Sequence, residues 1–73
     1  MGPIYRKGYF VVIRSYYDKH HFYYTVVNTR KHTHCHVNGK NIKAAKVMCC
    51  NARKHRIPEH YPNWMKEGIK RIL

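Results

Sequence analysis

The sequence predicts a small α+β domain, in which a three-stranded antiparallel sheet is followed by one helix and then by a C-terminal helix (βββα-α). Residues 8–37 favour strands, because they are rich in β-branched and aromatic side chains and are interrupted by two short polar stretches. Asn38-Gly39 is the strongest turn signal in the chain, and after it the apolar residues recur at helical spacing. With 73 residues, the chain has room for one domain, 1–73, and for a core of limited size.

The three strands are expected over residues 8–17, 22–29 and 32–37. A polar turn at 18–21 separates the first two strands, and Arg30-Lys31 separates the second from the third. No repeat and no low-complexity stretch interrupts this order.

The lengths of the turns decide which side chains share a face of the sheet, because side chains alternate along a strand with a period of two. If the turn at 18–21 is even in length, Tyr17 pairs with Phe22, and an even turn at 30–31 pairs Val26 with Cys35. One face is then apolar, so we expect helices to cover it and Cys35 to be buried. The opposite face is expected to carry Arg14, Tyr16, Tyr23, Thr25, His32, His34 and His36.

Apolar residues at helical spacing predict a first helix over 42–53, with Asn41 as its N-cap. Its buried stripe is expected to contain Ile42, Ala45, Met48, Cys49 and Ala52. Pro62 suits the first turn of a second helix that ends at Leu73. Gly68 in the middle of that helix costs about 1 kcal/mol relative to Ala, so we expect another element to pack closely against it.

The charge of the chain is its strongest functional signal. The chain has fifteen Lys and Arg residues and three acidic residues, Asp18, Glu59 and Glu67, which gives a formal net charge of +12. So much like charge destabilises the compact state by self-repulsion, which a negatively charged partner relieves. Nucleic acid, an anionic membrane surface and an acidic protein all fit, and a role in solubility alone is the simpler alternative.

The first helix is expected to present cations to phosphate groups. Lys43, Lys46 and Arg53 fall opposite its apolar stripe, and Lys40 precedes its N-terminus, where free backbone N–H groups also favour phosphate. The sheet is expected to add Arg14 as a phosphate contact and Tyr16 with Tyr23 as stacking partners for bases. The alternative is that two cross-strand tyrosines only stabilise the hairpin. The predicted nucleic-acid-binding residues are Arg14, Tyr16, Tyr23, Lys31, Lys40, Lys43, Lys46, Arg53 and Lys54.

His32, His34 and His36 are expected on one face of a strand, but the chain has no C-x-x-C pair and we predict neither a metal site nor a cofactor. The His34-x-His36 pair, with Tyr16 or Tyr17, resembles the metal-binding core of nucleases that form a phosphotyrosine link to single-stranded DNA. The resemblance covers three residues of 73, and the chain lacks the long domain of those enzymes. A ribonuclease with two imidazoles as general base and acid is a less demanding alternative. We predict a binding protein and not an enzyme.

Three cysteines, with Cys49 and Cys50 adjacent, favour free thiols and therefore a reducing compartment such as the cytoplasm. No signal peptide and no apolar run of membrane-spanning length is expected. The predicted partner is DNA or RNA, and the sequence also allows a homodimer. The alternative function is a protein-interaction module, an inhibitor or adaptor that docks its basic surface on an acidic protein. The small size of the chain suits a phage or a mobile element.

Overall fold

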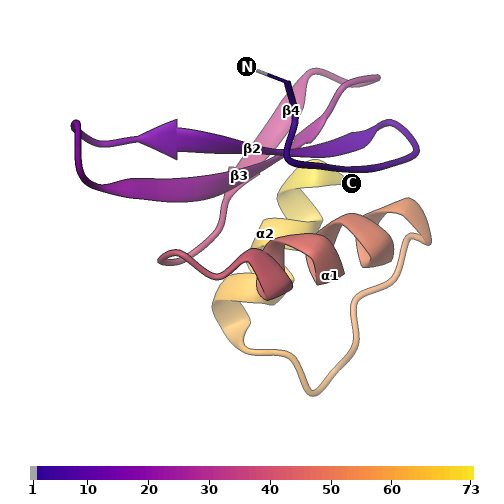
Figure 1. Ribbon diagram of the computed structural model, residues 1–73. Coiled ribbons are helices and arrows are strands. Elements are labelled where there is room, and N and C mark those ends of the chain that lie inside the picture. Colours follow the sequence, from indigo (N-terminus) through magenta and orange to yellow (C-terminus); the bar gives the residue numbers. More distant parts are fainter. Residues whose placement is uncertain (1) are drawn as a thin grey trace.

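Both helices pack against one face of an antiparallel sheet, and no helix of the described residues covers the other face (Figure 1). The computed structural model describes residues 2–73. The α+β class is confirmed, but the sheet has four strands instead of the predicted three, in the order β1-β2-β3-β4. The elements are β1 (Tyr5–Lys7), β2 (Phe10–Tyr16), β3 (Phe22–Asn28), β4 (Thr33–His36), α1 (Ile42–Arg53) and α2 (Asn63–Ile72).

The short strand β1 was not predicted from the sequence. Gly8 adopts a left-handed φ of 63°, and with Tyr9 it turns the chain so that Lys7 pairs with Phe10. The prediction placed both turn residues inside the first strand, because Gly8 precedes an unbroken run of β-favouring residues. A three-residue strand with two cations carries too little apolar alternation to be recognised without its partner.

The predicted register between the first two long strands is wrong by one residue. The loop that joins them contains five residues, 17–21, and not four, so Tyr16 and not Tyr17 pairs with Phe22. Asp18 shapes this loop, because its Oδ1 accepts hydrogen bonds from the backbone N–H groups of His20 (2.8 Å) and His21 (3.0 Å). An odd loop exchanges the two faces of β2 relative to the prediction.

The register between β3 and β4 agrees with the prediction. Four residues, 29–32, separate these strands, and Val26 pairs with Cys35. Cys35 is buried at 5% exposure and packs in the core beneath the helices. On β2, the residues that now face the core are Phe10 and Val12, both almost fully buried.

The two helices begin and end close to the predicted positions. The Asn41 side chain caps α1 by accepting a hydrogen bond from the N–H of Ala44 at 3.0 Å. α1 packs on β1, β2 and β3, while α2 packs on β3, β4 and α1. Pro62 directly precedes α2 and, as predicted, starts the helix with a residue that has no N–H to satisfy.

At Gly68, α2 packs closely against both α1 and the sheet. A Cβ atom at this position would lie 2.5 Å from Cε of Met48 and 2.8 Å from Sγ of Cys35. This close approach explains a glycine in the middle of a helix, as the sequence predicted. No helix among residues 2–73 is long and apolar enough to cross a membrane.

Candidate nucleic-acid interface

Most of the cationic side chains have no acidic partner. Among the described residues, two of the fifteen Lys and Arg side chains form ion pairs with Asp or Glu, Lys66 with Glu59 (3.9 Å) and Lys70 with Glu67 (3.6 Å). The third acidic side chain, Asp18, accepts hydrogen bonds inside its own loop, chiefly from a backbone N–H, and these lower its pKa. The positive charge of the chain is therefore largely uncompensated by its own carboxylates.

A series of cations follows the seam between α1 and the β1–β2 side of the sheet, and we call it the basic seam. At its start two cations converge on one ring: the guanidinium carbon of Arg14 lies 4.7 Å and Nζ of Lys40 lies 4.9 Å from the ring centre of Phe22. A cation over a ring is held in place by the ring's quadrupole without losing its charge. The residues of the basic seam are Arg14, Lys40, Lys46 and Arg53.

The other end of the basic seam lies against β1 and its turn. Nζ of Lys46 lies 5.3 Å from the ring centre of Tyr5, so β1 supports a helix cation in the same way. The side chain of Arg53 lies next to Gly8, where a Cβ would be 3.1 Å from Nε of Arg53. The unpredicted strand β1 thus positions cations that were predicted from α1.

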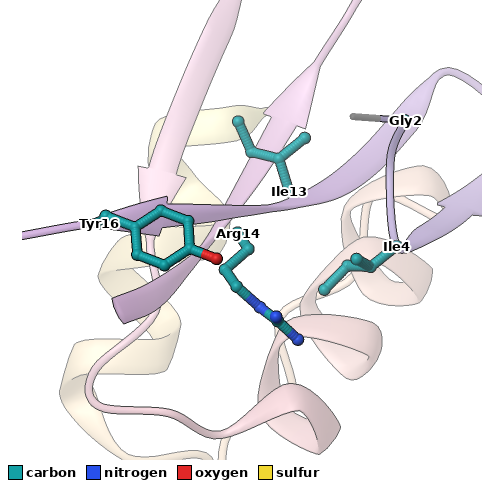
Figure 2. A pocket seen from close by; sticks show the side chains of 5 residues that line it. All are labelled: Gly2, Ile4, Ile13, Arg14 and Tyr16. Carbon is teal, nitrogen blue, oxygen red and sulfur yellow. The ribbon is translucent and has the colours of Figure 1, made fainter. Parts of the chain in front are cut away.

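The edge of β2 next to Arg14 has no neighbouring strand. β1 pairs with β2 only as far as Val12, and beyond that point β2 pairs with β3 alone. A hollow of about 380 Å³ opens there, and Figure 2 shows Arg14 extending toward α1 while Ile13 points to the opposite side of β2. The hollow is lined by Gly2, Ile4, Ile13, Arg14 and Tyr16. Hydrogen bonding to the hydroxyl of Tyr16, and then to that of Tyr24, raises the pKa of Arg14.

The predicted platform of Arg14, Tyr16 and Tyr23 does not form. Because of the odd loop, Arg14 and Tyr16 lie on the helix side of the sheet, whereas Tyr23 pairs with Ser15 on the opposite side. Tyr16 and Tyr23 therefore cannot hold the same nucleotide in the predicted way. Arg14 instead joins the cations of α1.

On the helix-free face, a different set of rings comes together, and we call it the ring row. Successive ring centres lie 4.4 Å apart for Tyr17 and Tyr23, 4.9 Å for Tyr23 and His36, and 5.1 Å for His36 and His34. The sequence prediction missed Tyr17 as a partner of Tyr23. Asp18 could have indicated the longer loop that brings Tyr17 to this face, because Asp side chains often accept hydrogen bonds from backbone N–H groups in turns.

A chain of hydroxyl groups supports the ring row from below. Oγ1 of Thr25 is hydrogen-bonded to Oγ of Ser15 (2.9 Å) and to Nδ1 of His36 (3.0 Å), and Thr25 is only 3% exposed. Beside these groups lies a shallow hollow of about 400 Å³, and it is lined by Ile13, Ser15, Thr25, Val27, His32, Thr33, His34 and His36.

The three histidines predicted to share a face line one hollow, but only two of them belong to β4. His32 precedes the strand and has a left-handed φ of 58°, while His34 and His36 lie within β4. Among residues 2–73, no group of three or more His, Cys, Asp or Glu side chains is arranged to hold a metal ion.

Three further cations that were predicted to bind phosphate lie outside the basic seam. Lys43 is on α1 but borders a hollow on its α2 side, together with Val47, Tyr61 and Met65. Lys31, in the β3–β4 turn, donates a hydrogen bond to the backbone oxygen of Leu73 at the end of α2. Lys54 follows the last residue of α1 and is exposed. The sequence therefore predicted four cations that the fold brings into one seam and three that it leaves apart.

The three cysteines are free thiols. Burial raises the pKa of Cys35, and burial followed by the nearby Cys50 raises the pKa of Cys49 to about 12. Sγ of Cys50 lies 3.8 Å from the hydroxyl of Tyr5, and this hydrogen bond is the main cause of a raised pKa of Tyr5. None of these groups faces the ring row.

Comparison with protein-family models, with curated proteins and with solved structures finds no match to this chain.

Proposed function

We propose that this chain is a small nucleic-acid-binding protein that contacts phosphate groups of DNA or RNA through the basic seam. The observation that carries the proposal is the convergence of Arg14 and Lys40 on the ring of Phe22, at 4.7 and 4.9 Å, in the absence of any ion pair to either side chain among the described residues. Neither cation is neutralised by a carboxylate, so a phosphate bound beside either one compensates charge that the chain itself leaves unpaired.

The spacing of the basic seam also favours an extended polyanion over a single small anion. Its members come from β2, from the residue before the α1 cap and from two positions along the 12 residues of α1. A polymer with regularly spaced phosphates engages such a series at several points, and each contact releases counterions. No enzymatic step is proposed.

Salt dependence of binding tests this proposal. We expect a labelled oligonucleotide to bind at about 50 mM salt, with a slope of log K against log salt of about −4 to −5 if about five phosphates are contacted. Fluorescence anisotropy at a series of salt concentrations measures both quantities. Lack of binding to duplex and to single strands at low salt would contradict the proposal.

A second candidate function is the docking of an acidic protein, and the unpaired edge of β2 favours it. The hollow next to this edge contains the exposed apolar side chains of Ile4 and Ile13 beside the cation of Arg14. An extended acidic segment could add to the edge as a further strand, with main-chain hydrogen bonds and one ion pair. Tight binding of poly-glutamate, together with no binding of an oligonucleotide of equal charge, would favour this alternative.

A further inference from the structure

We propose that the ring row on the helix-free face (Tyr17, Tyr23, His36 and His34) binds single-stranded nucleic acid by stacking its bases. This inference rests on the proposed function and names its substrate class. It assigns base contacts to a face opposite the basic seam and replaces the platform that the sequence predicted.

The ring row is accessible and continuous. Both helices lie on the other side of the sheet (Figure 1), and Tyr17 at one end of the row is 75% exposed. Neighbouring ring centres are 4.4 to 5.1 Å apart across the β2–β3 loop, β3 and β4. Four flat groups in sequence offer stacking positions to successive bases, and every base has a π-face with which to use them.

The rings are also held in place before any ligand binds. Tyr23 meets His36 edge-on at an interplanar angle of 88°, and Tyr17 leans on Tyr23 at 38°. Nδ1 of His36 is fixed by the buried Thr25, which leaves Nε2 as the ring atom free to bond a base edge. Rings ordered in advance lose less side-chain entropy on binding, which favours affinity.

The hollow beside the ring row suits a sugar or a flat base. Its lining includes the apolar side chains of Ile13 and Val27, while Ser15 and the two histidines of β4 supply hydrogen-bonding groups. A lining that combines apolar side chains with a few polar groups is typical of ligand sites. The mouth is open, so a strand can pass across it without threading.

Charge selects the occupant of this face. Arg6 pairs with Val11 and thus projects on the same side of the sheet as the ring row, whereas Glu59 lies in the loop before α2 and Glu67 in α2. Asp18 follows Tyr17 at the end of the row, where its carboxylate pairs with His21. The net charge of +12 disfavours a second copy of the chain, which would bring two equal charges together. The bases of a duplex are stacked on each other inside the helix. Among polyanions, a single strand therefore has bases that can stack on exposed rings.

Paired tyrosine variants test the ring row directly. Tyr17→Ala and Tyr23→Ala should each weaken binding of an oligothymidine of about 16 nucleotides by about 5- to 150-fold, whereas Tyr→Phe at either position should change it little. Binding of a duplex of equal length should be unchanged. Trp64→Ala is the matched control, because it removes an exposed aromatic residue from α2, away from both surfaces.

The outcomes separate this inference from the proposed function. One outcome is that the wild-type chain binds both oligonucleotides with steep salt dependence while the alanine variants bind the single strand as tightly as the wild type does. That result would contradict base stacking on the ring row and leave the proposal of phosphate contacts through the basic seam intact. If the wild-type chain binds neither, both proposals fail together. Tyr17→Ala decides the matter even if Tyr23→Ala proves unstable, because the exposed Tyr17 side chain contributes little to the core.

Photocrosslinking supplies a second readout that does not depend on affinity. A single strand containing bromodeoxyuridine should crosslink to a peptide that contains Tyr17 or Tyr23. Crosslinks confined to residues of α1 and β1 would overturn the ring row and assign the single strand to the basic seam.

Discussion

The hydroxyl of Thr25 lies 3.0 Å from Nδ1 of His36 and links this imidazole to the sheet beneath it. Thr25 is itself nearly inaccessible, and its second contact, with Oγ of Ser15 at 2.9 Å, runs across β2 and β3. A buried hydroxyl thus determines how an exposed ring is presented, which is the arrangement expected where a ring must be oriented for a ligand.

Thr25→Val tests this relationship, because valine keeps the β-branched shape and removes the hydroxyl. Ser15 and His36 can bond to water instead, so the free energy of unfolding should fall by no more than about 1 kcal/mol. Single-strand affinity should fall measurably, while duplex affinity should not. Nitrogen NMR of the His36 ring should change from one dominant tautomer to a mixture; an unchanged ring signal would mean that Thr25 does not hold it.

Charge reversal on α1 tests the basic seam. Lys46→Glu with Arg53→Glu should strongly weaken binding of both duplex and single strands. On a duplex, the slope of log K against log salt should become shallower by about 0.9 for each phosphate that the variant no longer neutralises. The fold should persist, because both side chains are exposed and lie opposite the buried stripe of α1.

Lys70→Glu with Arg71→Glu provides the matched control for the net charge. It changes the charge of the chain by the same amount on α2, away from the basic seam. An equal decrease of binding in the two double variants would mean that overall charge, and not the seam, governs affinity.

Gly68→Ala tests the close packing of α2 against α1 and the sheet. Alanine favours a helix by about 1 kcal/mol relative to glycine, but its Cβ would lie 2.5 Å from Met48 and 2.8 Å from Cys35. Overpacking of this kind costs about 1–3 kcal/mol, so we expect a net decrease in the free energy of unfolding. Urea unfolding measures it, and Met48→Val in the same chain should restore part of the stability by removing the atom that clashes. A rise in stability for Gly68→Ala alone would contradict the observed packing.

Stability at alkaline pH tests the burial of Cys49. Its pKa is raised from 9.0 to about 12, chiefly by burial, so the folded chain keeps a proton that the unfolded chain releases. The stability that this thiol contributes is complete below pH 9 and declines progressively as pH rises toward 12. Tyrosines and lysines also titrate in this range, so the informative quantity is the difference between the wild-type chain and Cys49→Ala. The stability of the variant should decline less steeply above pH 9; identical slopes would place Cys49 outside the core.

Several features of the chain were determined by the sequence alone. The period of apolar residues after Asn38-Gly39 and the capping side chain of Asn41 predicted α1, because helix formation depends on neighbours along the chain. The β3–β4 pairing and the burial of Cys35 followed from an even turn between alternating strands. The excess of cations over three carboxylates needed no structure to be recognised.

Tertiary structure decided which side chains meet. Alternation shows which residues of one strand share a face of the sheet. Which of these faces matches the core face of the next strand depends on whether the connecting loop has an odd or an even number of residues. The loop that Asp18 shapes is one residue longer than predicted. That single residue moved Arg14 to the cations of α1 and brought Tyr17 to Tyr23. β1 likewise exists because pairing with β2 completes hydrogen bonds that three residues cannot make by themselves.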